Sequence, residues 1–187
     1  MSTAVFWVIA IVIVVIILWF IAVYNRFVVL RNRIQGSWAQ VDVQLKKRYD
    51  LVPNLVETVK GYAKHEREVF ENVTKARANA IGAQTVADQG QAENMLTGAL
   101  KSLFAVAEAY PELKANENFL KLQEELASLE SKIAYARQHY NDVVLAFNTQ
   151  RQRFPDNIVA GVMGLTPADY FEIEEAAREA PKVDFGA

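Results

Sequence analysis

The most constraining feature of this chain is a run of nineteen uncharged residues, Val5 to Val23. A helix rises about 1.5 Å per residue, so the run would span roughly 28 Å, close to the hydrocarbon thickness of a bilayer. The run is rich in Val and Ile, but a lone strand in lipid would leave its backbone N–H and C=O groups unpaired, whereas a helix pairs them internally. We therefore predict a transmembrane helix over residues 5–23, preceded by a short N-terminus at residues 1–4.

Aromatic residues stand near both ends of the predicted span. Trp7 lies near one end, and Trp19 and Tyr24 lie near the other, as expected for the aromatic belts of the two membrane interfaces. The competing interpretation is a cleaved signal peptide. It fits less well because no basic segment precedes the run, the run is longer than a signal peptide's apolar core, and no small-residue cleavage site follows. We favour a permanent anchor, with the lipid bilayer as a partner.

Basic residues follow the span closely, at Arg26, Arg31 and Arg33, whereas no Lys or Arg precedes it. The positive-inside tendency therefore predicts a single-pass protein of the cell membrane, with its N-terminus outside and the remaining chain in the cytoplasm. These arginines could also meet anionic lipid head groups, or they could form a solvated helix face. With the three aromatic residues they make up the predicted membrane interface.

Apolar residues recur at helical spacing over residues 24–154, and no segment shows the alternation and hairpin turns of a strand. The predicted helices cover residues 24–52, 53–81, 91–110 and 119–154. Pro53 is expected to break the first helix, Gly82–Gly90 to form a flexible connection, and Pro111 to end the third helix. The pattern predicts an all-α fold in which the transmembrane helix continues into an antiparallel up-and-down bundle of about four long helices.

The last of these helices has the clearest packing seam. Its apolar residues follow two seven-residue rows: Phe119, Leu126, Ile133, Tyr140 and Phe147, and Leu122, Leu129, Ala136 and Val143. Two asparagine pairs, Asn25 with Asn32 and Asn141 with Asn148, are also seven residues apart. Such asparagines either lie buried and fix the register of helix packing or lie exposed beside the seam.

Residues 155–187 form the C-terminal segment. In an up-and-down bundle the fourth helix returns toward the membrane, so residues 155–165 would arrive near the bilayer. Their apolar side chains could dip into the interface, or they could cap the open end of the bundle core, which is the interpretation we favour. Beyond Thr166 the chain is acidic, and we expect a weakly ordered extension.

The sequence argues against an enzyme. It has no cysteine, and His65 and His139 are its only histidines, neither at metal-ligand spacing. The Gly161–Gly164 stretch lacks the lysine of a phosphate-binding loop and is predicted to be a turn. The carboxylate pairs Glu124–Glu125 and Glu174–Glu175 are typical of solvated helix faces. We predict no catalytic, cofactor-binding or metal-binding residue, and the net charge of -2 gives no reason to expect nucleic acid as a partner.

Long blocks of this sequence resemble the LemA family of bacterial and archaeal proteins. The blocks are RNRIQGSWAQVDVQLKKRYDLVPNLVETVKGYAKHE from Arg31, AEAYPELKANENFLKLQEELASLESKIAYARQHYNDVVLAFN from Ala107, and RFP from Arg153. The resemblance implies an N-terminal anchor followed by a helical bundle, and it carries no established catalytic residue. Related domains occur in proteins linked to membrane organisation, including magnetosome formation, and in gene neighbourhoods with membrane proteases.

Three functional hypotheses remain. The first is a membrane-anchored scaffold that self-associates as a homo-oligomer and organises or shapes the membrane, with Tyr24, Phe27 and Val28 as contacts between copies at the bilayer surface. The second is an adaptor or regulator of another membrane-protein complex, such as a membrane protease. A hydrolase or metal enzyme is the third class, and the absence of a recognisable site argues against it.

Overall fold

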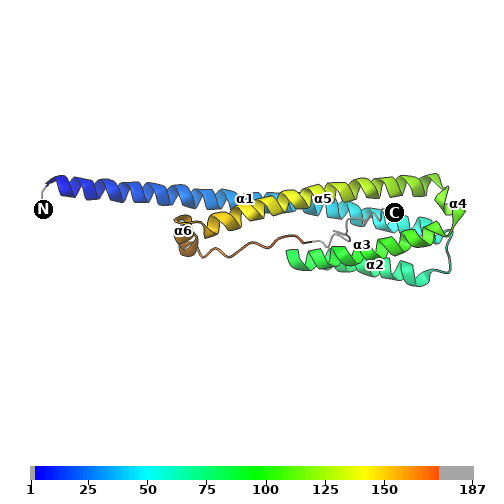
Figure 1. Cartoon of the computed structure of the whole chain (residues 1–187). Coiled ribbons are helices and arrows are strands. Elements are labelled where there is room, and N and C mark those ends of the chain that lie inside the picture. The colour runs from blue at the N-terminus through cyan, green and yellow to red at the C-terminus, as the bar shows by residue number, and fades with distance from the viewer. Residues whose placement is uncertain (1–2, 173–187) are drawn as a thin grey trace, which may run out of the picture. The chain divides into compact units, whose positions relative to one another are not determined.

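The computed structural model describes residues 3–172, which form α-helices joined by short connections (Figure 1). The helices are α1 (Thr3–Lys60), α2 (Arg67–Gly82), α3 (Val86–Glu108), α4 (Pro111–Lys114), α5 (Glu117–Gln152) and α6 (Asp156–Val162). Helices α4 and α6 are short, with 4 and 7 residues, and residues 3–172 contain no strand. The predicted all-α fold, with a long apolar N-terminal helix leading into a helical bundle, is confirmed.

The chain divides into two compact units. Among the described residues, unit 1 comprises residues 3–46 and 129–170, and unit 2 comprises residues 47–128 and 171–172. Helices α1 and α5 each contribute one part to unit 1 and another part to unit 2. Each unit therefore has its own core and is described separately.

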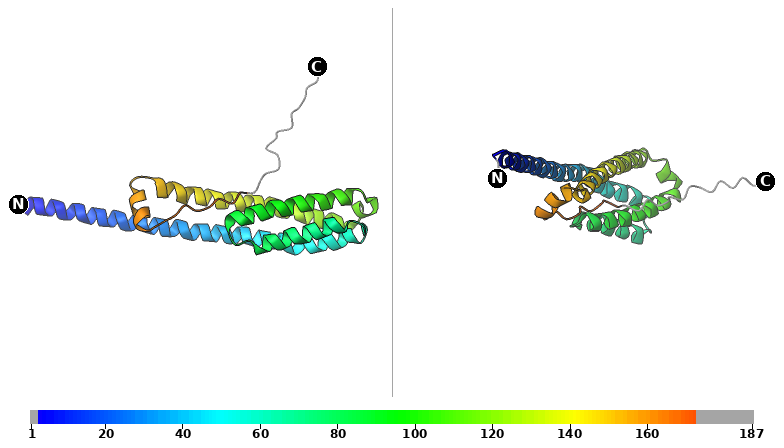
Figure 2. Two further views of the ribbon diagram at one scale, coloured as in Figure 1. Left: turned by 90° about the horizontal axis from the view of Figure 1, so that it is seen from below. Right: turned by 60° about the vertical axis from the view of Figure 1, so that its left-hand side comes forward.

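In unit 1, α1 and α5 pack antiparallel through aromatic side chains. The rings of Phe27 and Phe147 lie edge to face with centroids 6.1 Å apart, and those of Trp38 and Tyr140 do the same at 5.2 Å. Residue numbers rise along α1 while those of the partners on α5 fall, so the two helices run in opposite directions. Near its end α5 turns at residues 153–155 into α6, which lies beside α1 (Figure 2).

The seam predicted for the last long helix is largely buried. Every residue of the first predicted row is buried, as are Leu129 and Ala136 of the second, whereas Leu122 and Val143 are only half-buried. At the end of the second row, the buried position is Val144 instead of Val143. A straight α-helix drifts by about 20° per heptad from a seven-residue repeat, which explains this shift by one residue.

In unit 2, α2 and α3 lie side by side as a helical hairpin (Figure 1). The connection between them is shorter than predicted. Only residues 83–85 separate the helices, because Thr85 caps α3: its Oγ1 accepts a hydrogen bond from the backbone N–H of Asp88 at 3.1 Å. The prediction of a flexible connection over Gly82–Gly90 is therefore wrong for residues 86–90. Gly90 serves packing instead, since a Cβ there would lie 2.3 Å from the carbonyl oxygen of Glu172.

The predicted break at Pro53 is also wrong. Helix α1 passes through Pro53 and ends at Lys60, and α2 begins only at Arg67. Proline has no N–H, so the carbonyl of Tyr49, four residues earlier, loses its usual partner within the helix. The Nε–H of Arg77 on α2 donates to that carbonyl at 2.7 Å, and the lost hydrogen bond is thereby replaced.

The asparagine pairs do not fix helix register as one interpretation held. Asn25 and Asn32 are exposed, and Asn141 is half-buried. Asn148 is buried, but its partner is the backbone of Ala168: the side-chain Oδ1 accepts from the N–H of Ala168 and Nδ2 donates to its C=O, both at 2.9 Å. In unit 1 this side chain therefore holds the segment that follows α6 against α5.

Candidate functional site

The first candidate site is the apolar start of α1. It includes a stretch of 18 apolar residues, none of which is buried. Within residues 3–172, α1 is the one helix that is long and apolar enough to cross a membrane. Its exposed residues run almost without interruption from Val5 to Leu18. A soluble helix of this composition would bury these side chains, so their exposure is compatible with a single-pass anchor in lipid.

The structure places the predicted interface residues in two environments. Trp7, Tyr24 and the three arginines Arg26, Arg31 and Arg33 are exposed. Trp19 is instead half-buried, because it packs against a core cluster that includes Val23. Whether these residues meet lipid head groups remains a prediction.

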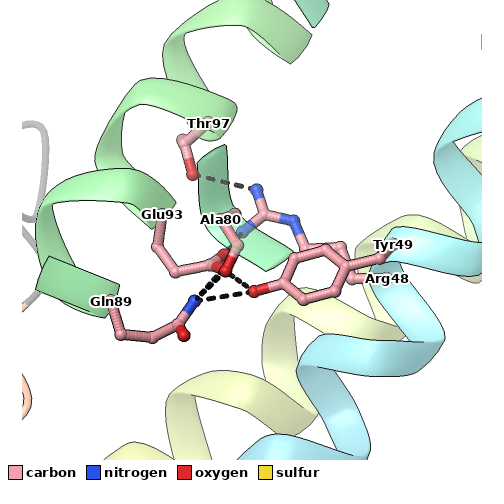
Figure 3. Close-up of polar contacts among 6 residues, drawn as sticks. All are labelled: Arg48, Tyr49, Ala80, Gln89, Glu93 and Thr97. Atoms are coloured by element: carbon pink, nitrogen blue, oxygen red, sulfur yellow. Dashed lines mark hydrogen bonds and ion pairs between the residues drawn. The ribbon is translucent and has the colours of Figure 1, made fainter. Parts of the chain in front are cut away.

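The second candidate site is a buried polar network in unit 2 (Figure 3). Arg48 of α1 is 2% exposed and Glu93 of α3 is fully buried, and the Nη1 of Arg48 donates to the Oε2 of Glu93 at 2.7 Å. The Nη2 of Arg48 donates to the Oγ1 of Thr97 at 2.9 Å. Tyr49 and Gln89 complete the network from the other side of the carboxylate.

The second carboxylate oxygen of Glu93, Oε1, is contacted by Tyr49 and Gln89. The hydroxyl of Tyr49 donates to Oε1 of Glu93, and the Nε2 of Gln89 is within hydrogen-bond distance of the Tyr49 hydroxyl at 2.8 Å, of Oε1 at 3.1 Å and of the Ala80 carbonyl at 3.1 Å. Burial, together with the adjacent Glu93 carboxylate, raises the pKa of Tyr49 well above its usual range. The phenol is therefore held in its neutral form as a hydrogen-bond donor.

Sequence reasoning missed this network, although a signal for it was present. On α1, Arg48 lies three positions after the buried Leu45 and four before the buried Val52, and on α3 Glu93 lies three positions before the buried Leu96, so both charges fall on the buried side of their helices. A charged residue at helical spacing from buried apolar residues is expected to be buried as well. A buried charge needs a partner of opposite sign. Two opposite charges on two seams therefore predict one buried pair.

The network suits a structural role better than a chemical one. Arg48 and Glu93 are almost completely shielded from solvent, and the carboxylate already accepts hydrogen bonds from arginine, tyrosine and glutamine. A reacting acid or base needs access to a substrate within hydrogen-bond reach. This arrangement instead fixes the position of α1 against α3.

Other polar residues considered from the sequence do not come together. His65, His139, Glu124 and Glu125 are exposed, and within residues 3–172 no group of three or more possible metal ligands is found. The Glu174–Glu175 pair lies outside the described residues. Gly164, at φ +62°, follows the end of α6, and the Leu165 N–H donates to the Ala160 carbonyl at 3.0 Å. The predicted turn over Gly161–Gly164 is therefore confirmed at residues 163–164 and wrong for Gly161 and Val162, which belong to α6.

Comparison with known proteins finds relatives at modest sequence identity. The chain is 24% identical over 184 residues to magnetosome protein MamQ 2 of Paramagnetospirillum magneticum, covering 84% of this chain and 67% of that protein. It is 23% identical over 184 residues to magnetosome protein MamQ of Magnetospirillum gryphiswaldense, with the same coverage. It is 24% identical over 152 residues to protein LemA of Metamycoplasma hominis, covering 79% of this chain and 68% of that protein.

The family profile matches the helices beyond the first part of α1. Residues 37–185 match the LemA family, which includes most of α1 beyond the apolar run and all of α2 to α6. The first 36 residues, with the apolar run, lie ahead of the match. The described fold, the exposed apolar start of α1 and this match together identify a membrane-associated helical protein that belongs to the LemA family.

Proposed function

We propose that this chain is a non-enzymatic, membrane-anchored helical scaffold whose copies associate with one another at the membrane and organise or shape it. The observation that carries the proposal is the continuity of α1, whose single helix from Thr3 to Lys60 joins the exposed apolar run to buried positions in both units. Because the anchor and these buried residues belong to one helix, the depth of the anchor in the membrane sets how far the buried residues of α1 lie from the membrane surface.

The exposed residues just beyond the apolar run support self-association. Tyr24 and Val28 are exposed, lie four residues apart and so share one face of α1. Phe27, which the sequence also suggested as a contact between copies, is only 1% exposed because it packs against Phe147, so that suggestion is wrong. The proposed contact between copies is therefore the Tyr24–Val28 face.

The names of the relatives fit this proposal. MamQ proteins are named as magnetosome proteins, and the proposal takes this chain, like them, to be part of a larger cellular assembly. The exposed Arg26, Arg31 and Arg33 support an orientation with the helical units in the cytoplasm, since basic residues that flank a span are retained on that side.

Cysteine crosslinking in native membranes tests self-association, because the chain has no cysteine of its own. A Val28→Cys variant treated with a short bis-maleimide is expected to give a crosslinked dimer of this chain. The matched control is Val29→Cys, an exposed valine that the rotation of about 100° per residue turns away from the Tyr24–Val28 face. Its yield should fall if contact is confined to the Tyr24–Val28 face.

Two results would contradict the proposal. A monomer in nanodiscs by mass photometry, with no crosslink from Val28→Cys, would remove self-association. A crosslink from Val28→Cys to a different integral membrane protein would instead favour the adaptor role. A catalytic role would require an activity that survives purification and is lost on substitution of a polar residue, and residues 3–172 present no assembled site for one.

A further inference from the structure

Helix α6 has two faces with opposite properties. Its inner face buries Val159 and Ala160, which join Val23, Phe27 and Phe147 in one core cluster. On this face, the Asp156 carboxylate accepts a hydrogen bond from the side-chain amide of Gln150. The inner face thus closes the core of unit 1, in agreement with the cap interpretation of residues 155–165.

The outer face of α6 is apolar and exposed. Phe154, just before the helix, is 76% exposed, Ile158 is 55% exposed and Val162 is 71% exposed. These residues recur every four positions, and Ile158 and Val162 share one face of the helix. Capping the core therefore leaves three large apolar side chains in contact with solvent.

The position of α6 along α1 indicates what covers this face. The core cluster that α6 joins includes Val23, the last residue of the uncharged run, and Trp19 and Phe20 pack against it. The next residues of α1 are Tyr24 and, two positions on, the exposed Arg26. Helix α6 consequently contacts α1 where the apolar run ends and where the hydrocarbon of a bilayer would give way to head groups.

Charge around the outer face has the sign expected for an anionic surface. Arg153, between α5 and α6, is exposed, and Arg151 is half-buried, whereas Asp156 is buried and bonded to Gln150. An exposed apolar face bordered by arginine is typical of helices that lie in the interface plane of membranes that contain acidic lipids.

We propose that α6 is an interfacial element whose exposed Ile158 and Val162, together with Phe154 just before the helix, insert into the lipid leaflet from which α1 emerges. The proposal rests on the anchor role proposed above and names a second point of contact with the bilayer. Together with α1, this contact would give unit 1 a fixed tilt and depth at the surface, and the added volume in one leaflet is a physical route to bending the membrane.

Site-directed spin labelling of the full chain tests the insertion. Single cysteines at Ile158 and Val162 carry a nitroxide, and the protein is reconstituted into vesicles of phosphatidylcholine and phosphatidylglycerol. The measured quantity is the ratio of the collision rate with oxygen to that with a water-soluble nickel chelate. At both positions this ratio should be several-fold higher than at Glu124→Cys, an exposed position in unit 2. The matched control on the same helix is the exposed, polar Asn157→Cys, which should be more accessible to the chelate.

The outcomes separate the failure of this inference from the failure of the anchor. Val14→Cys, in the middle of the apolar run, must be accessible to oxygen and not to the chelate; if it is in water, the anchor role itself is wrong. With Val14→Cys in lipid, aqueous values at Ile158→Cys and Val162→Cys would overturn the insertion. So would equal values at all three α6 positions, or low accessibility of Ile158→Cys and Val162→Cys to both oxygen and the chelate, which would show that protein and not lipid covers the face.

Discussion

The two units bury different chemistry at their centres. In unit 1, α1 and α5 meet through edge-to-face aromatic rings and aliphatic side chains. In unit 2, the same two helices contribute to a core that also holds the Arg48–Glu93 ion pair and its hydrogen-bond partners. Apolar cores tolerate shifts and substitutions that conserve volume, whereas an ion pair in a dry interior is favourable only in one geometry. We infer that shape and periodicity align unit 1 and that polar complementarity aligns α1 with α3 in unit 2.

The largest effect is expected from removing one charge of the buried pair. Glu93→Leu would leave the Arg48 guanidinium buried without its carboxylate, and loss of one partner of a buried pair costs about 3–5 kcal/mol of folding free energy. In unit 1, Ile133→Leu conserves the volume of a buried side chain and should cost less than about 1.5 kcal/mol. Urea unfolding of the full chain in mild detergent, followed by circular dichroism, measures both.

A double substitution sharpens this comparison. Arg48→Met with Glu93→Leu replaces the pair with apolar side chains, and such exchanges are often neutral or stabilising. The double variant should therefore be more stable than Glu93→Leu alone. If it is equally unstable, the ion pair is not what aligns unit 2, and the contrast between the units fails.

The next effect concerns the proline inside α1. Arg77→Met removes the donor to the Tyr49 carbonyl and should cost about 1–3 kcal/mol, the cost of a buried polar group left without a partner. In a Pro53→Ala background the same substitution should cost less, because the new N–H at position 53 can pair with that carbonyl within the helix. A double-mutant cycle by urea unfolding measures the coupling, and equal costs in both backgrounds would contradict this account of Pro53.

Pro53 also shows where prediction from sequence stops. The apolar spacing predicted the helical nature of the chain, the positions of most buried residues and the seam of the last long helix, because helix periodicity is a local property. The break at Pro53 was predicted from a local rule as well, but the donor that compensates for the proline is Arg77, 24 positions away on another helix. A local rule does not include a tertiary hydrogen bond.

The candidate sites were predictable to different degrees. The exposed apolar run followed directly from nineteen uncharged residues. The buried network was not predicted, because a search for apolar residues at helical spacing passes over Arg48 and Glu93, which are charged but occupy buried positions. The role of Asn148 could not be predicted either, since its partner Ala168 belongs to a segment without regular secondary structure.

A smaller effect is expected at Asn148 in unit 1. Its side chain holds the segment that follows α6 and does not align the long helices. Asn148→Ala removes two hydrogen bonds to the backbone of Ala168 and should cost about 1–2 kcal/mol. Hydrogen exchange should speed up at Ala168 and its neighbours but not at Phe27 or Tyr140. Asn32→Ala, an exposed asparagine of the same predicted set, should change stability by less than about 0.5 kcal/mol. Faster exchange throughout α5 in Asn148→Ala would show that Asn148 aligns the helices after all.

The smallest effect is confined to alkaline pH and concerns the polar core of unit 2. Burial and the Glu93 carboxylate raise the folded-state pKa of Tyr49 above the ordinary tyrosine value of 10.0. As pH rises past that value, the unfolded chain loses this proton first while the folded chain keeps it, so the contribution of Tyr49 to stability is complete below pH 10.0 and is lost above it.

The stability of the unsubstituted protein should therefore fall more steeply above this pH than that of Tyr49→Phe, which has no phenol to titrate at this position. Urea unfolding at a series of alkaline pH values, with Tyr135→Phe as an exposed control, measures the two slopes. Parallel slopes would mean that the Tyr49 hydroxyl titrates freely, and the polar core of unit 2 would then be open to water and no better shielded than the surface.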